Sequence, residues 1–378
     1  MYQIPLFNLN FDEAETKAVT DTLASKWISM GPRCEALEQR FREMLHVRYA
    51  CAVTSCTAAL HLACYALGLG PGDEVICPSL TFAATVNCIR YVGATPVFCD
   101  VVGNGDLCLD PAAAEALITP RTKAIIPMHF AGYPCDMDAI LRLAKAHGLA
   151  VIEDACHGPL SEYHGRMLGT IGNVGCFSFF SNKNISSGEG GMLVTNDEAL
   201  YQRCKLLRSH GMTSMSYQRA TGHATSYDIA EIGFNYRLDD IRASIALAQL
   251  DKLAGDYARR RQVRAHYERR LGGDDRLAVP FTGYPEPVSN YIFPVVLTTG
   301  TEDDRDRIRT SLAEKGVQTS IHYPAAHLFS AYSAFRRPLP NTEYITAHEF
   351  TLPMYAQLTE AEVDYVCDCV LQALNELA

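Results

Sequence analysis

One lysine, Lys183, stands between an aromatic run and a tract of serines and glycines in the stretch 177–192, FSFFSNKNISSGEGGM. This pattern fits neither an amphipathic helix nor a solvated loop. A lysine amine that is partly desolvated, with a lowered pKa, can form a Schiff base with a carbonyl group. The alternative, a phosphate-loop lysine, requires GxxxxGK[ST], whereas the glycines here follow the lysine. We therefore expect something small and polar to lie against Lys183.

A second group, Ser55, Cys56 and Thr57, stands between a predicted strand and a predicted helix. Free backbone N–H groups and the helix dipole make such a junction suitable for an anion, for example a phosphate. A plain helix cap by Ser55 or Thr57 is the alternative, and taken alone it is the simpler interpretation.

Two further groups occupy similar junctions. Phe82 begins the helix after the next strand, where its ring could stack on a planar ligand or simply fill the core. Asp154 ends the strand in VIEDACHG, and His157 follows three residues later. A carboxylate there could hold a protonated heterocyclic nitrogen, or it could cap a helix.

The scaffold that must position these groups alternates short apolar runs with helix-like segments. We predict strands over 49–55, 73–79, 95–101 and 149–155, further apolar segments at 122–130, 175–180 and 190–196, and helices over 57–70, 82–93 and 137–148. This alternation predicts an α/β fold whose mostly parallel sheet is covered by helices on both faces. In such sheets, ligands bind at the carboxyl ends of the strands, where the four groups lie.

Beyond residue 240 the pattern changes. A long helical stretch over 238–271, which we expect to break near Gly255, leads into a mixture of strands and helices. We therefore predict a large α/β domain over residues 1–245, N-terminal arm included, and a smaller α+β domain over 246–378 that begins with the long helix.

Composition limits the partners. The formal net charge of −10 disfavours a nucleic-acid partner or an anionic membrane. The fourteen cysteines are scattered through apolar runs without a CxxC pair, so we expect reduced core thiols and no metal site. Neither a signal peptide nor an apolar run of membrane-spanning length is evident. We expect a soluble, cytoplasmic protein.

Together, the four groups are an anion site, a stacking ring, a carboxylate for a ring nitrogen and a lysine. Pyridoxal 5'-phosphate requires these four partners, and it then serves as an electron sink. A nicotinamide oxidoreductase is the weaker hypothesis, because no GxGxxG motif is present.

The sequence also closely resembles the DegT/DnrJ/EryC1/StrS family of sugar aminotransferases, which are pyridoxal-phosphate enzymes of fold type I. The resemblance runs through nearly the whole chain, in the ordered motifs GPRCEALEQRF, TAALHLA, TFAATVNCIRYVGATPVFCDV, VIEDACHG, GCFSFFSNKNISSGEGGML, LRSHGM, GFNYRLDDIRASIALAQLDKL and IHYPAAHL.

This resemblance implies a role for each candidate. Lys183 would be the Schiff-base lysine, and Asp154 the partner of the pyridine nitrogen. His157 would lie near the phenolic oxygen of the cofactor, and Phe82 would stack on its ring. The cofactor phosphate would be held by Ser55, Ser178 and the backbone of Cys56 and Thr57, and by Asn235 of GFNYR from the neighbouring subunit of a homodimer.

Two departures from the family pattern stand out. Cys56 occupies a position where many members have glycine, and Asn182 replaces a commoner threonine before the lysine. Some relatives carry histidine in place of the lysine and act as dehydratases, but this chain keeps Lys183.

The resemblance thus implies ping-pong transfer of an amino group from glutamate or glutamine to a keto group of a nucleotide-linked deoxysugar. Ser29, His322 and Tyr323 are candidates for the substrate cavity, although they could equally be ordinary loop residues. The alternatives are a sugar dehydratase or deoxygenase that uses the same cofactor, an aminotransferase for a cyclitol or another antibiotic-precursor ketone, and a non-catalytic protein on the same scaffold.

Overall fold

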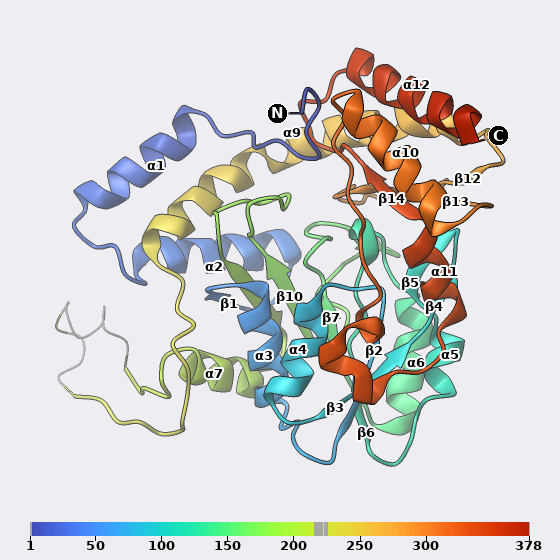
Figure 1. The fold of residues 1–378 in the computed structure, drawn as a ribbon. Coiled ribbons are helices and arrows are strands. Elements are labelled where there is room, and N and C mark those ends of the chain that lie inside the picture. Colours follow the sequence, from blue (N-terminus) through green and yellow to red (C-terminus); the bar gives the residue numbers. More distant parts are fainter. Residues whose placement is uncertain (1, 215–221, 223–225, 378) are drawn as a thin grey trace.

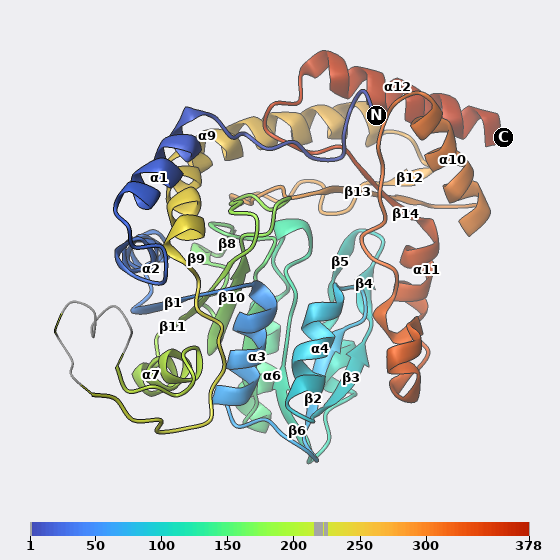
Figure 2. The ribbon, with the colours of Figure 1, turned by 60° about the vertical axis from the view of Figure 1, so that its left-hand side comes forward.

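The computed structural model describes residues 2–214, 222 and 226–377 of the chain. Its centre is a seven-stranded sheet in the order β1-β11-β10-β7-β6-β2-β3 (Figures 1 and 2). The strands are β1 (Tyr49–Val53), β2 (Glu74–Pro78), β3 (Thr95–Cys99), β6 (Thr122–Ile125), β7 (Ala150–Asp154), β10 (Val174–Ser178) and β11 (Gly191–Thr195). Only β11 runs against its neighbours, so the predicted mostly parallel sheet is confirmed.

Helices cover both faces of the sheet, as predicted. Along β1, Cys51 and Val53 join the core beneath α3 (Cys56–Ala66) and α4 (Ala83–Tyr91). Ala50 and Ala52, which point the other way, join a second core with residues of α2 (Pro32–Leu45) and α9 (Asp240–Leu271). The period-2 geometry of a strand sends successive side chains to opposite faces, and both faces are apolar here.

The C-terminal part forms a smaller layer above the sheet (Figure 1). The strands β12 (Leu277–Ala278), β13 (Phe293–Leu297) and β14 (Glu349–Leu352) make an antiparallel sheet. It shares a separate apolar core with α10 (Glu302–Glu314) and α12 (Glu360–Leu377). Ile4 of the N-terminal arm belongs to this same core and pairs with Val317. The division of the chain at residue 245 stays a prediction.

The expected break near Gly255 is wrong. Helix α9 runs unbroken through 32 residues and connects the region of α2 with that of α12 (Figures 1 and 2). A single glycine costs a helix only about 1 kcal/mol relative to alanine. The buried Leu250, Leu253 and Arg260 on either side anchor the helix and outweigh this cost.

The remaining elements are short or peripheral. They are α1 (Glu13–Ala24), β4 (Val101–Gly103), β5 (Asp106–Leu109), α5 (Pro111–Glu115), η1 (Phe130–Gly132), α6 (Met137–His147), β8 (Glu162–Tyr163), β9 (Arg166–Met167), α7 (Glu198–Leu207), η2 (Ala326–Leu328), η3 (Ser330–Phe335) and α11 (Pro340–His348). All fourteen cysteines are free and buried, as core thiols should be. Among the helices described, none is long and apolar enough to cross a membrane.

Candidate active site

A cavity of about 640 Å³ opens beyond the carboxyl ends of β1, β2, β7 and β10. Nine of the predicted site residues line it: Ser55, Cys56, Thr57, Phe82, Asp154, Ser178, Lys183, His322 and Tyr323. The ends of the strands and the segment before η2 together supply these side chains, although up to 268 positions separate them along the chain. This is the place where an open α/β sheet binds its ligands.

The predicted anion site lies around the start of α3. Ser55 is the N-cap of this helix, and its hydroxyl accepts a hydrogen bond from the N–H of Ala58 at 3.1 Å, so the capping interpretation is confirmed. Because β11 lies between β1 and β10, Gly191 stands opposite both Val53 and Ser178. A Cβ atom on Gly191 would lie 2.5 Å from the carbonyl carbon of Ser55. The glycine therefore lets the helix start and Ser178 approach one another.

Asp154 is held by a short chain of hydroxyl groups. Thr85, in α4, donates to Asp154 Oδ2 at 2.7 Å, and Thr81 Oγ1 lies 2.7 Å from Thr85 Oγ1. The N–H of Cys156 donates to the other carboxylate oxygen at 3.3 Å. All these side chains are buried. The carboxylate is thus fixed in one orientation at the floor of the cavity.

Lys183 lies in the closed loop between β10 and β11, whose ends are joined by hydrogen bonds from Phe179 N–H to Gly190 O and from Ser187 N–H to Phe179 O. Its Nζ sits 4.2 Å from the centre of the Tyr291 ring. The lowered pKa that we expected is not what the structure indicates. Burial opposes the charge of the ammonium, but the neighbouring Tyr291, Cys156 and Asp154 favour it, so the pKa is raised.

His157 lies beneath the cavity, fully buried. Its Nε2 is 2.9 Å from the hydroxyl of Tyr323, and its ring packs against Tyr291 at a centroid distance of 4.3 Å. Burial, followed by the positive charge of Lys183, lowers the pKa of His157 well below its usual range. The neutral imidazole therefore stays available as a hydrogen-bonding group.

These residues suit pyridoxal phosphate. Phe82 exposes 58% of its surface at the mouth of the cavity, as a ring that stacks on a ligand would. Two buried polar atoms beside the cavity, His157 Nδ1 and Asn182 Oδ1, have no partner among the described residues. Such atoms are expected where a ligand completes the hydrogen bonding.

Comparison with known proteins decides the family. The model of the DegT/DnrJ/EryC1/StrS aminotransferase family matches residues 10–371. The chain belongs to this family. The enzyme is therefore a pyridoxal-phosphate-dependent sugar aminotransferase, and its fold is that of such enzymes.

Three relatives illustrate the similarity. The spore coat polysaccharide biosynthesis protein SpsC of Bacillus subtilis is 36% identical over 376 residues, which are 98% of this chain and 95% of SpsC. The putative sugar aminotransferase Spr1654 of Streptococcus pneumoniae in its PMP form superposes with a TM-score of 0.93 at 29% identity and covers both chains fully. Helicobacter pylori PseC superposes with a TM-score of 0.92 at 29% identity over 99% of each chain.

Three predicted residues lie away from the cavity lining, and other residues were missed. His157 contacts two residues of the lining, Tyr323 and Tyr291, whereas Ser29 and Asn235 are exposed elsewhere on the chain. The sequence did not reveal Thr85 and Tyr291. Thr85 lies one helical turn after Thr81 and Phe82, a spacing that could have suggested it, but nothing near Tyr291 in sequence indicates its contact with Lys183.

Proposed function

We propose that this aminotransferase moves the amino group of glutamate or glutamine to a keto group of a nucleotide-linked deoxysugar. The observation that carries the proposal is the meeting of Lys183 and Asp154, from two different strand ends, in one cavity of about 640 Å³. This volume lies within the range usual for small-molecule sites. The related PseC, described as acting in pseudoaminic acid biosynthesis, supports a sugar as the acceptor.

The positions of the predicted cofactor-binding residues support a role for each of them. Asp154, fixed by Thr85, would keep a proton on the ring nitrogen of the cofactor, because a buried carboxylate stabilises a cation in hydrogen-bonding contact. The N–H groups at the start of α3 and the hydroxyl of Ser178 would hold the phosphate. Phe82 would cover one face of the ring. When bound, pyridoxal phosphate supplies an electron sink.

Lys183 would have two tasks. At rest its Nζ would hold the cofactor covalently, and after release it would carry a proton between the donor carbon and a carbon of the cofactor. The raised pKa suits the ammonium form, which gives up a proton in the second task. Tyr291, below the amine, would keep Nζ directed into the cavity.

An absorbance scan tests the proposal. The purified enzyme with its cofactor should show a visible band that falls when glutamate or glutamine is added. Borohydride reduction followed by peptide mass spectrometry should place the pyridoxyl group on Lys183. A band that neither donor changes would contradict the proposed donors, and an unmodified Lys183 would contradict its role.

The products separate the alternatives. An aminotransferase leaves the sugar unchanged when the donor is omitted, whereas a dehydratase or deoxygenase consumes it. Testing a keto sugar nucleotide against a keto cyclitol, each with the same donor, distinguishes the two acceptor classes. Amination of the cyclitol alone would overturn the proposed acceptor.

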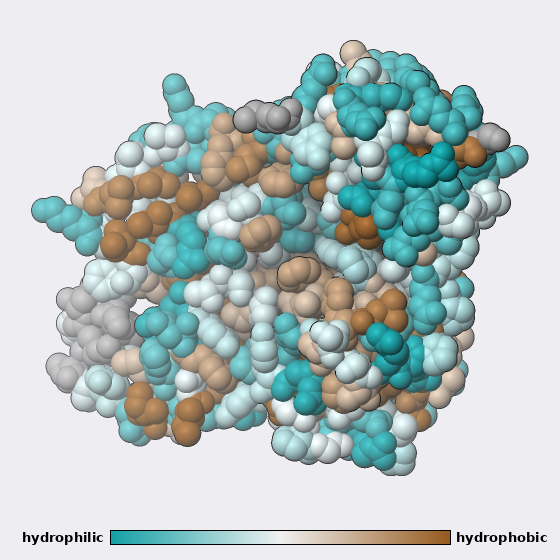
Figure 3. Space-filling view, viewed as in Figure 1, coloured by the Kyte–Doolittle hydropathy of each residue, from teal (hydrophilic) through white to brown (hydrophobic). Residues whose placement is uncertain are grey.

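We also infer that the enzyme works in the cytoplasm as a homodimer with shared active sites. Hydrophobic side chains gather over α1 on the surface in Figure 3, and Phe7, Leu9, Phe11, Leu23 and Ile28 are exposed in the N-terminal region. Exposed apolar patches are typical of interfaces. The exposed Asn235 would then contact the cofactor phosphate of the partner subunit. Fourteen free thiols favour a reducing compartment.

A further inference from the structure

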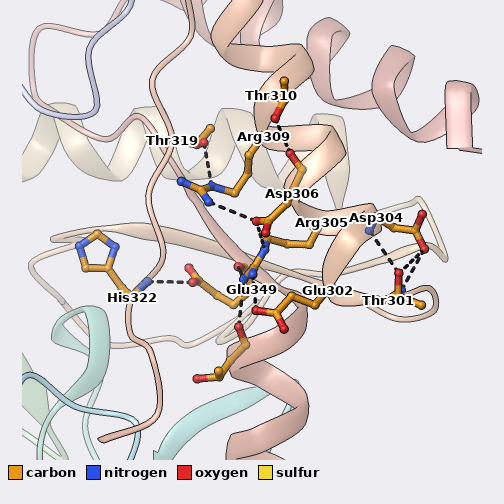
Figure 4. A network of polar contacts seen from close by, with 11 residues as sticks. Thr301, Glu302, Asp304, Arg305, Asp306, Arg309, Thr310, Thr319, His322 and Glu349 are labelled. Atoms are coloured by element: carbon orange, nitrogen blue, oxygen red, sulfur yellow. Dashed lines mark hydrogen bonds and ion pairs between the residues drawn. The ribbon is translucent and has the colours of Figure 1, made fainter. Parts of the chain in front are cut away.

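A buried chain of three side chains leads away from the cavity. His322 lines the cavity, and its Nδ1 lies 2.8 Å from Thr351 Oγ1. The Thr351 hydroxyl in turn lies 2.5 Å from Glu349 Oε1. The other carboxyl oxygen of Glu349 accepts the backbone N–H of His322 at 2.8 Å (Figure 4). Glu349 and Thr351, both on β14, are completely buried.

One hydroxyl proton links the two ends of this chain. When Glu349 is ionised, it can only accept, so Thr351 donates to it and must accept from Nδ1–H of His322. The neutral imidazole carries a single proton, so its Nε2 is then an unprotonated acceptor. Nε2 has no hydrogen-bond partner among the residues described, and His322 borders the cavity.

The arrangement reverses when Glu349 is protonated. The carboxyl group then donates to Thr351, and the Thr351 hydroxyl donates to Nδ1 of His322. The imidazole proton must now reside on Nε2, which becomes a donor. Protons balance, because Nε2 takes one proton from the cavity while the Nδ1 proton passes to Thr351 and the Thr351 proton passes to Glu349.

The charge of His322 itself does not change in this exchange. Burial, followed by the positive charge of Lys183, lowers the pKa of His322 to about 3. The imidazole is therefore neutral wherever the enzyme is folded and active at ordinary pH. What can change is the tautomer of His322, that is, which ring nitrogen carries the proton. The tautomer decides whether Nε2 presents a donor or an acceptor to the cavity.

Glu349, in contrast, can titrate near physiological pH. The charged and titratable groups that face it are Arg305 and Arg309 from α10 and His322 and Tyr323 from the segment before η2. Burial raises the pKa of Glu349 to about 8, although the hydroxyl of Thr351, the N–H of His322 and the two arginines oppose this shift.

The two arginines only partly offset the burial, because their charges are already paired. Arg305 donates to Asp306 at 2.7 Å and to Glu302 at 2.9 Å, and Arg309 pairs with the same Asp306 at 3.3 Å (Figure 4). Toward Glu349, Arg305 reaches only the backbone carbonyl, at 3.3 Å.

We propose that Glu349 is a positioning residue that, through Thr351, sets whether His322 Nε2 offers substrate a hydrogen-bond acceptor or a donor. The inference rests on the proposed function in one respect, namely that substrate occupies the cavity. A substrate carboxylate or phosphate can only accept a hydrogen bond, so it is bound well when Nε2 carries the proton. Binding of that group should weaken as pH rises through 8.

The first test reads the tautomer directly and needs no substrate. Long-range ¹H–¹⁵N spectra of the holoenzyme labelled at histidine report which ring nitrogen carries the proton, and the His322 signal is identified by its loss in His322→Asn. In the wild type the proton should move from Nε2 to Nδ1 as the pH rises through about 8. In Glu349→Gln it should remain on Nε2, because the amide oxygen accepts the His322 N–H and the amide N–H donates to Thr351.

The controls separate this role from a structural one. Thr351→Val should abolish the movement of the proton, and Thr351→Ser should restore it. Glu302→Gln removes a carboxylate from the same arginine network but leaves the three-residue chain intact, so it should behave as the wild type. The proposal would be overturned if the His322 ring proton stayed on one nitrogen at every pH in the wild type. It would also be overturned if the proton moved with pH in Glu349→Gln.

The second test measures KM for the donor and for the acceptor between about pH 6 and about pH 10. One KM should rise about tenfold across the midpoint in the wild type, which corresponds to the loss of one hydrogen bond, and should be flat in Glu349→Gln. If neither the donor KM nor the acceptor KM of the wild type changed with pH, the proposed effect of His322 on substrate binding would be overturned. The proposed function is tested separately, by the modification of Lys183 and by conversion of the donor. If both are observed, flat KM profiles contradict only the role of Glu349.

Discussion

At the floor of the cavity, the hydroxyl of Thr85 determines how Asp154 is oriented. Thr85→Val keeps nearly the same volume in this fully buried position but removes the donor to Oδ2. A hydrogen bond to a charged group is worth about 1.5–3 kcal/mol, so we expect kcat to fall about tenfold or more. Steady-state kinetics at saturating cofactor check this value.

The neighbouring hydroxyl provides a matched control. Thr81→Val removes only the partner of Thr85 and leaves its bond to Asp154, so its effect on kcat should be smaller. Asp154→Asn, which removes the charge itself, should be the most severe of the three. Equal losses for both threonine variants would contradict the assigned direction of the hydrogen bonds.

Glu349 also makes stability depend on pH. Its pKa is raised to about 8 in the fold, whereas in an unfolded chain it is close to the usual 4.5, so the folded state binds more protons between these values. Stability should therefore fall as pH rises from 5 to 8. Glu349→Gln should lose this component, which is on the order of a few kcal/mol. Denaturant unfolding of both proteins at several pH values measures the difference, and parallel profiles would contradict it.

At the scale of elements, we expect the start of β11 to determine whether the predicted anion site can bind phosphate. Gly191→Ala would place a Cβ atom 2.5 Å from the carbonyl carbon of Ser55 and 2.6 Å from the N of Cys56. The backbone at the start of α3 would have to move, and such overpacking costs about 1–3 kcal/mol. We expect the affinity for pyridoxal phosphate to fall about tenfold, measured by titration of the apoenzyme. If Gly191→Ala bound pyridoxal phosphate as tightly as the wild type, Gly191 would have no role in cofactor binding.

The long helix α9 gives the opposite expectation for a glycine. Gly255 is exposed in mid-helix, and a Cβ atom there would meet nothing within 4 Å. Gly255→Ala should raise stability by about 0.5–1 kcal/mol and leave cofactor binding unchanged. The reverse change at the adjacent exposed position, Ala254→Gly, should lower stability by a similar amount. Thermal unfolding measures both, and a destabilised Gly255→Ala would show that the helix needs its glycine.

These elements also show what the sequence could predict. Strands such as 73–79 and 149–155 were recognised because their apolar runs and glycine-ended helices are local signals. Asp154 was predicted because it ends such a strand, and Lys183 because it stands between an aromatic run and a tract of serines and glycines. The contacts of Lys183 with Tyr291 and of His322 with Thr351 were not, because they join distant parts of the chain and depend on how the smaller sheet packs on the larger one.

At the scale of the whole molecule, the proposed dimer with shared active sites predicts complementation between two inactive variants. A dimer of one Lys183→Ala chain and one Asn235→Ala chain would contain one intact site, with Lys183 from one chain and Asn235 from the other. Random re-association of equal amounts should restore about a quarter of the wild-type activity, because half of the dimers are mixed and each has one working site.

The unmixed variants are the baseline for this measurement. Each should remain well below the mixture after the same dissociation and re-association. A mixture no more active than the average of its two components would mean that Asn235 serves its own subunit or no active site at all.

Because all fourteen thiols are buried, each one can serve as a probe of unfolding in the part of the structure around it. An alkylating reagent present during gradual heating modifies a cysteine only where the surrounding structure has opened. Cys367 and Cys369 report on the core shared with α12, Cys34 on the core beneath α2, and the other eleven on the core beneath α3 and α4. Peptide mass spectrometry of one heated sample would therefore rank the three cores by the order in which they open.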